Sequence, residues 1–112
     1  MTTMPVPFEH RAPRDDLLTR VARRGAGISL GEVVVFLAIV QEGSFTAAAR
    51  RLHLSQPGVS GRVSRLEHAL GYRLLDRSRR AVRLTPDGYR FVHAAQTVLR
   101  VVDEAMVQVP PR

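Results

Sequence analysis

The chain has 112 residues, 45% of them hydrophobic, and carries a formal net charge of +7 at pH 7. This composition is that of one small folded domain and excludes a disordered polycation. The absence of cysteine excludes disulfides and thiolate metal sites, and the longest apolar run, Val33 to Val40, is too short to span a bilayer.

Residues 1–28 are expected to form a largely flexible N-terminal extension. Three prolines interrupt residues 1–13, which have little periodic apolar content. Residues 15–24 are compatible with a short helix, because three apolar side chains share one side and Gly25 would end it. A disordered arm is an equally good interpretation of the same residues.

Residues 30–41 are predicted to form the first secure helix. Ser29 is a suitable N-cap, and Glu32 stands at the position that completes a capping box. Apolar residues recur at helical spacing and give this helix one apolar face, and Gly43 then ends it.

Two further helices, 45–52 and 56–70, are predicted to follow across a tight turn. Ser44 and Ser55 are placed to cap them. The second helix has an apolar face at core spacing, consisting of Val59, Val63, Leu66 and Leu70. Its opposite face is small or polar, as a face laid against another polymer would be, and consists of Pro57, Gly61, Ser64, Arg65 and His68.

A basic hairpin, or wing, is predicted next. Its strands are expected at 72–76 and 81–84, joined by the turn Arg77-Ser78-Arg79-Arg80. Five arginines stand against one acidic residue within residues 73–83. A solvated turn and a contact with a phosphate backbone both fit this pattern, and the density of arginine favours the contact.

A long helix is predicted over 85–109, followed by a tail over 110–112. Thr85 is placed to cap it, with Pro86 at its first position. Apolar residues recur at intervals of 4, 3, 4, 3 and 4, which is a heptad seam, at Phe91, Ala95, Val98, Val102, Ala105 and Val109. At 1.5 Å per residue the helix is roughly 37 Å long, too long for its far half to pack on so small a domain. The seam therefore predicts a partner helix, most simply that of a second subunit.

The order of these elements predicts a mainly α fold. We expect a winged helix-turn-helix over 29–84, with a three-helix bundle and a two-stranded wing, followed by a long dimerisation helix. All 17 basic residues are arginine, and residues 29–84 hold 9 of them against 4 acidic residues. Generic surface charge is one interpretation, but this concentration in the middle segment is typical of a nucleic-acid-binding domain.

Particular residues make the interpretation specific. The chain resembles the LysR-type transcriptional regulators from about Leu30 to Ala105, in the motifs Glu42-Gly43-Ser44-Phe45-Thr46-Ala47-Ala48-Ala49, Leu52-His53-Leu54-Ser55-Gln56-Pro57, Leu66-Glu67, Leu70-Gly71, Arg73-Leu74-Leu75 and Leu84-Thr85-Pro86-Asp87-Gly88. The resemblance implies sequence-specific binding of double-stranded DNA by a homodimer that reads an inverted repeat. It also implies dimerisation through the predicted long helix.

The resemblance implies two sets of DNA contacts. The candidates for reading bases are Gln56, Pro57, Ser60, Gly61 and Arg62. The candidates for contacting the DNA backbone are Thr46, Ser55, Ser64, Arg65, Arg77, Arg79 and Arg80. Gln56 can pair bidentately with adenine. Gly61 departs from the family, which often has a long basic residue at this position, so a base contact is expected to be missing or shifted there.

A further expectation concerns what the chain does not contain. Relatives continue into a domain that binds a small co-inducer, and the 112 residues have no room for it. We therefore expect a regulator without an effector site, cofactor or metal. Both an excised domain and a naturally short protein fit the sequence.

Two other functions are compatible with parts of the sequence. An enzyme is disfavoured because the four histidines lack metal-ligand spacing and no carboxylate pair suits a cleft. A protein-interaction module, which uses the heptad helix to pair with a full-length relative, is the stronger alternative. Without a secretory pattern in the first 25 residues, we expect a cytoplasmic, nucleoid-associated protein with no membrane contact.

Overall fold

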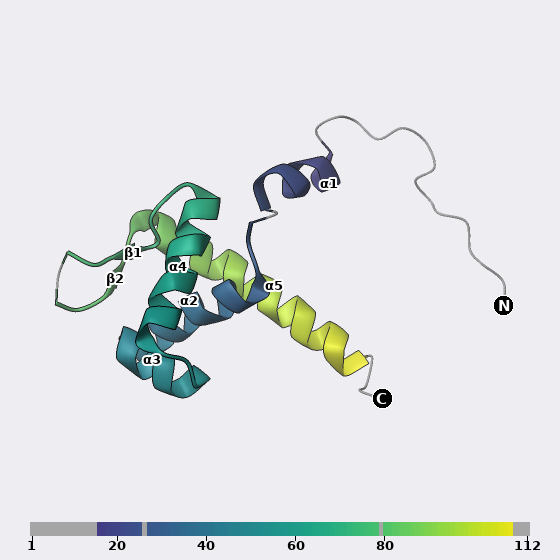
Figure 1. Cartoon of the computed structure of the whole chain (residues 1–112). Helices are drawn as coiled ribbons and strands as arrows, with labels where there is room; N and C mark the ends of the chain where they lie inside the picture. The colour runs from purple at the N-terminus through teal and green to yellow at the C-terminus, as the bar shows by residue number, and fades with distance from the viewer. Residues whose placement is uncertain (1–15, 26, 79, 109–112) are drawn as a thin grey trace, which may run out of the picture.

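The computed structural model describes residues 16–25, 27–78 and 80–108, so the expectations for residues 1–15, Arg79 and 109–112 lie outside it. Its elements are α1 (Leu17–Arg20), the π-helical turn η1 (Val21–Gly25), α2 (Leu30–Glu42), α3 (Phe45–Leu52), α4 (Gln56–Leu70), β1 (Leu75–Asp76), β2 (Arg83–Leu84) and α5 (Pro86–Gln108). This is the predicted mainly α architecture, with a helical bundle, a wing and a long final helix (Figure 1).

The helices of the bundle begin where their capping side chains predict. Ser29 Oγ accepts the N–H of Glu32, and the Glu32 carboxylate accepts the N–H of Ser29, which completes the capping box. Ser44 and Ser55 each accept the backbone N–H three residues further along the chain. Gly43 ends α2 in the left-handed conformation, with φ of 72°.

The core lies where α2, α4 and the segment after α4 meet, with α3 packed against α2 and α4. Its largest fully buried side chains include Phe36, Ile39, Leu66, Leu74, Leu75, Val59 and Val63. Two small residues of α3, Ala48 and Ala49, are also buried and let this helix approach the others closely. In Figure 1, α4 crosses in front of α2, and its outer face is not covered by another element.

The wing is shorter than the sequence predicted. Its strands have two residues each, paired antiparallel, in place of 72–76 and 81–84. At the start of β1, the buried Glu67 carboxylate accepts the N–H groups of Leu74 and Leu75 at 2.8 and 3.2 Å, and α5 already begins at Pro86. At the other end of the ladder, the Asp76 carboxylate accepts the N–H of Ser78, so the turn begins directly after β1.

The start of α5 is locked to the segment before the wing. Thr85 Oγ1 accepts the N–H of Gly88 at 2.9 Å and donates to the carbonyl of Arg73 at 2.7 Å. A Cβ atom on Gly88 would overlap the carbonyl oxygen of Leu74, so the close approach of α5 requires glycine here. Figure 1 shows the second half of α5 extending away from the bundle.

The part of the N-terminal extension that the structure describes is partly helical. The expected helix over 15–24 takes the form of the short α1 followed by the wider turn η1. The carboxylate of Asp16 caps α1 by accepting the N–H of Thr19 at 2.9 Å. η1 packs against the C-terminal end of α4, near Ala69 and Leu70.

Candidate nucleic-acid interface

The outer face of α4 collects the residues predicted to read bases. Gln56 and Pro57 are exposed at its N-terminal end, and Ser60 and Gly61 are half-buried on the next turn. Ser64 is exposed one turn beyond them. The opposite face supplies fully buried core residues, so α4 is fixed by one side and presents the other. A helix held in this way can enter a groove of DNA without rearrangement of the core.

Two arginines on α4 are held by contacts within the protomer. Arg62 Nη1 donates to the carbonyl of Gly58 at 3.2 Å, so the side chain folds back toward the first turn of α4. Arg65 Nε lies 3.6 Å from Glu32 Oε2, while 63% of the Arg65 side chain remains exposed. Arg65 is therefore the better placed of the two to reach a phosphate.

Gly61 leaves an open position on this face. A Cβ atom built there would lie 3.7 Å from Arg65 Nη1, which is an ordinary contact distance. Packing therefore does not require glycine at this position. The consequence is local: the backbone of α4 is accessible where the family resemblance leads us to expect a long basic side chain.

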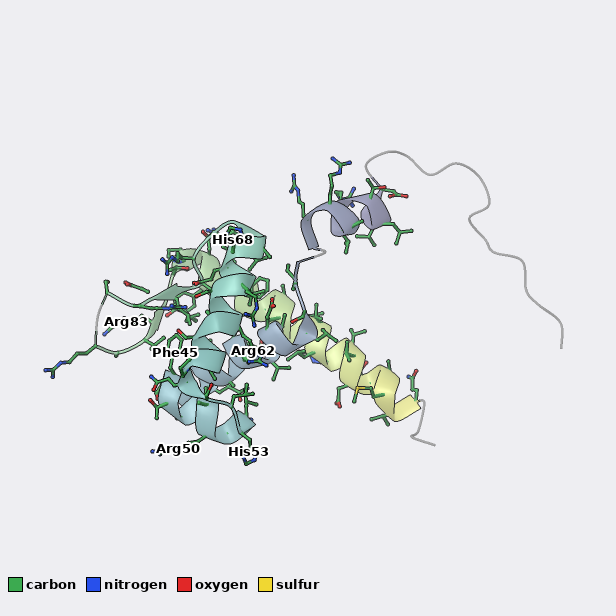
Figure 2. The ribbon with its side chains drawn as sticks, viewed as in Figure 1. Phe45, Arg50, His53, Arg62, His68 and Arg83 are labelled. Carbon is green, nitrogen blue, oxygen red and sulfur yellow. The ribbon has the colours of Figure 1, made fainter. Side chains whose placement is uncertain are left out.

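The end of α3 adds a residue that the sequence analysis did not single out. Arg50 is exposed in the last turn of α3, close to the turn residue His53 (Figure 2). Its neighbour Arg51 instead donates to Gln41 and Glu42 of α2, at 2.6 and 3.0 Å. The adjacent pair of arginines was a visible signal, but only the structure distinguishes the exposed member from the one paired with α2.

The two remaining residues predicted to contact the DNA backbone near this turn are Thr46 and Ser55. Both are exposed, Thr46 in the first turn of α3 and Ser55 immediately before α4. The Ser55 hydroxyl is already the N-cap of α4, where it accepts the N–H of Gly58 at 3.0 Å. It retains its own O–H as a donor, which a phosphate oxygen can accept.

Two arginines of the wing, Arg77 and Arg80, lie in different environments. Arg80 is exposed in the turn that connects β1 to β2. The Arg77 guanidinium lies 3.4 Å from Glu67 Oε1 and 5.0 Å from the centre of the Phe45 ring, and only 31% of its side chain is exposed. The turn between them is shaped by Asp76, whose carboxylate accepts the N–H of Ser78. Arg80 points to solvent, whereas Arg77 is engaged within the protomer.

The predicted seam on α5 divides into a buried part and an exposed part. Ala95 is only 2% exposed and belongs to the core of the protomer, and the half-buried Phe91 packs edge-on against Phe36 of α2, at the edge of that core. The interface prediction for Ala95 is therefore corrected: α2 covers this part of the seam. Further along, Val98 is 44% exposed and Val101, which the seam did not include, is 58% exposed.

The exposed part of α5 adjoins an apolar groove. The groove has a volume of about 220 Å³ and is lined by Ile28, Ser29, Leu30, Val33, Phe91, Ala94, Ala95 and Val98. Leu30 at its rim is 45% exposed. Beyond the groove Val102 is half-buried and Ala105 is exposed, whereas Val109 lies outside the described residues. An apolar strip therefore continues from the start of α2 along α5.

The helical bundle, the uncovered face of α4 and the adjoining hairpin together define a winged helix-turn-helix domain. Residues 30–89 match the model of the family described as bacterial regulatory helix-turn-helix protein, lysR family. This match covers more than half of the chain, and the chain belongs to the LysR family.

Solved structures with similar folds include complexes with DNA. The "BenM_DBD/catB site 1 DNA complex" has a TM-score of 0.71 and 38% identity, over 73% of this chain and 92% of that one. The "CbnR_DBD-DNA complex" has a TM-score of 0.69 and 33% identity, over 73% of this chain and 94% of that one.

A curated relative from Azotobacter vinelandii, an "Uncharacterized HTH-type transcriptional regulator in ibpB-leuC intergenic region", is 42% identical over 77 residues. The match covers 69% of this chain and 54% of the relative. The HTH-type transcriptional regulator BenM of Acinetobacter baylyi is 44% identical over 69 residues, which is 62% of this chain and 23% of the relative. The match thus spans about half the length of the first relative and about a quarter of the length of the second.

The described parts of the chain show neither a metal site nor a single helix that could span a membrane. No group of three or more His, Cys, Asp or Glu side chains in residues 16–25, 27–78 and 80–108 is arranged to hold a metal ion. No single helix in these ranges is long and apolar enough to cross a membrane. The bent pair Leu17–Gly25 and Leu30–Glu42 meets that test only by combined length and composition.

Proposed function

We propose that this chain binds double-stranded DNA sequence-specifically as a homodimer and serves as a transcriptional regulator. The observation that carries the proposal is the uncovered face of α4, which begins at the exposed Gln56 and Pro57 and lies beside a basic wing. The likeness to two domains solved with DNA supports it. A bacterial regulator of this kind acts on the chromosome, so the proposal includes a cytoplasmic, nucleoid-associated location.

Base recognition is assigned to the N-terminal half of α4. Gln56 is exposed and can form a bidentate pair with adenine in the major groove. Pro57 and Ser60 flank it on the same face, and Gly61 lets the DNA approach the helix backbone. Arg62 would have to leave the Gly58 carbonyl before it could reach a base, which makes it the weakest member of this set.

Contacts with the DNA backbone are assigned to the exposed polar residues around this face. They are Thr46, Ser55, Ser64, Arg65 and Arg80, to which we add Arg50. Arg79, predicted from the sequence to belong to the same set, lies outside the described residues. These contacts fix the register of the protein on the duplex and supply affinity that does not depend on sequence. They release counterions, so binding is expected to weaken steeply as salt is raised.

Dimerisation is assigned to the exposed strip on α5. Val98, Val101 and Val102 present apolar surface on a helix about 34 Å long, whose second half extends beyond the bundle. The apolar groove beside Leu30 can receive side chains of a second α5. A two-fold dimer would place two copies of α4 in successive major grooves, about 34 Å apart on an inverted repeat.

A second candidate function uses the same strip. The exposed apolar side of α5 can pair with the corresponding helix of a full-length relative, which would make this chain a protein-interaction module. In that case, capture of the relative would be insensitive to salt. DNA binding by the chain alone would then be no stronger than expected for a generic protein of charge +7.

The experiment that tests the proposed function is selection of duplexes from a random pool, followed by footprinting at several salt concentrations. The proposal expects an enriched inverted repeat, protection of two half-sites, and an affinity that falls steeply with salt. Enrichment of no sequence, together with salt-insensitive pairing to a relative, would favour the second candidate.

A further inference from the structure

One side chain at the C-terminal end of α4 connects the recognition helix to the wing. Glu67 is buried, with 6% exposure, and its Oε2 accepts the N–H groups of Leu74 and Leu75. Its Oε1 lies 3.4 Å from Arg77 Nη2 and 4.0 Å from Arg73 Nη1. Both carboxylate oxygens therefore have partners: one accepts backbone N–H groups at the start of the wing, and the other faces two arginines.

Arg77 extends this connection to α3. Its guanidinium lies over the Phe45 ring, 5.0 Å from the ring centre, a geometry in which a cation and an aromatic face attract each other. Phe45 is the first residue of α3. In Figure 2 it lies on the side of α4 that faces the hairpin, near Arg83. Arg77 thus follows directly after β1 and is held by residues of both α3 and α4.

The position of Arg80, in the turn of the wing, depends on this arrangement. β1 and β2 have only two residues each, so their own pairing holds the hairpin weakly. The contacts of Arg77 with Glu67 and Phe45 fix the end of β1 on the bundle. A wing fixed at this point presents Arg80 in one position relative to α4.

We infer that Arg77 is a positioning residue, which orients the wing through Glu67 and Phe45 instead of contacting DNA itself. This inference rests on the proposed function, in which the wing contacts the DNA backbone. It reverses the sequence-based assignment of Arg77 to that backbone. It also makes Phe45 and Glu67, which carry no DNA contact of their own, determinants of how the wing is placed.

The first test uses the protein without DNA. Arg77→Ala and Phe45→Leu are expected to raise amide hydrogen exchange about tenfold or more across the β1–β2 pairing, with the core of α2 unchanged. Arg80→Ala is the matched control, because it removes an exposed arginine from the turn of the same hairpin, outside the strand pairing, and it should leave exchange as it is. Unchanged exchange of the wing in Arg77→Ala would overturn the inference.

The second test is a double-mutant cycle on a selected duplex. If Arg77 acts through the wing, Arg80→Ala weakens binding in the wild type but adds little in the Arg77→Ala background. Phe45→Leu, which changes no charge, should reduce the effect of Arg80→Ala in the same way. Fold-losses that simply multiply in both cycles would mean that Arg77 contacts DNA directly, and would overturn the inference.

The two arms separate the failure of the inference from the failure of the proposed function. A wing loosened by Arg77→Ala in a protein that binds no duplex would refute the proposed function and leave the positioning of the wing supported. Sequence-specific duplex binding with an unaltered wing would refute the positioning role alone.

Discussion

The rings of Phe91 and Phe36 meet edge-on, with centroids 5.6 Å apart and planes inclined at 64°. This contact joins the first turns of α5 to α2, and the buried Ala95 continues it one turn further. The same helix is therefore a core element at its start and a projecting element at its end. Changes at the two ends of α5 should consequently have different effects.

A change at the start of α5 should reduce stability. Phe91→Ala removes the ring that packs on Phe36 and is expected to lower the free energy of unfolding by about 3 kcal/mol, because it leaves a cavity in the core. Tyr89→Ala, at a residue 65% exposed, should change it by less than about 0.5 kcal/mol. Urea denaturation measures both. Equal effects of the two variants would contradict this packing of Phe91 on Phe36.

A change further along α5 should alter assembly and leave the fold intact. Val98→Asp with Val101→Asp places two charges on the exposed apolar strip, so the dimer is expected to dissociate to monomers. The control, His93→Asp with Gln96→Asp, adds the same residues at exposed polar positions of the same helix. Sedimentation at micromolar concentration distinguishes them. A dimer that survives the first pair would rule out an interface on this strip.

The exposed arginine on α4 should contribute affinity without specificity. Arg65→Ala is expected to weaken selected and random duplexes alike, and to reduce the salt slope by about 1, because one phosphate contact is lost. Arg100→Ala removes the same charge from an exposed position on α5. Titrations at several salt concentrations compare the two variants. If both lower the slope equally, net charge explains the effect and Arg65 makes no particular contact.

The cap of α1 should make this short helix sensitive to acid. The N–H of Thr19 donates to the Asp16 carboxylate and holds its pKa below the ordinary value of 3.8. Because the pKa is lowered in the folded state, the stabilisation is complete above pH 3.8 and is lost as the pH falls through the folded value. The amide shift of Thr19, followed by NMR from neutral to acid pH, should report this transition. Asp16→Asn keeps a hydrogen-bond acceptor at this position but has no carboxyl group to titrate, so the transition should be absent in this variant.

The parts of the fold governed by neighbours in sequence were predictable. Ser44 and Ser55 bond to amides three residues away, so α3 and α4 could be placed to the residue. The start of β1 could not be predicted, because the carboxylate of Glu67, on another element, accepts the N–H groups of Leu74 and Leu75. Alternation of apolar residues contains no information about such a long-range acceptor.

The candidate site, like the fold, could be predicted only in part from the sequence. The exposed positions of Gln56 and Pro57 followed from the apolar spacing on the opposite face of α4. The heptad pattern on α5, however, does not show whether its apolar face packs within the protomer or on a second subunit. At Ala95 the face packs within the protomer, where α5 lies against α2. Likewise, Arg77 and Arg80 look alike in sequence. Only the position of Phe45 and Glu67 in space distinguishes the arginine held in the protomer from the exposed one.

The central claim is that the exposed end of α4 reads bases, and Gln56→Ala tests it most directly. The measurement is the ratio of affinities for the selected duplex and for random duplexes at one salt concentration. Loss of the bidentate contact is expected to reduce the difference in binding free energy that this ratio expresses by on the order of 1–3 kcal/mol, with little change for random DNA. Gln96→Ala on α5 should leave the ratio unchanged. An unchanged ratio for Gln56→Ala would contradict the account.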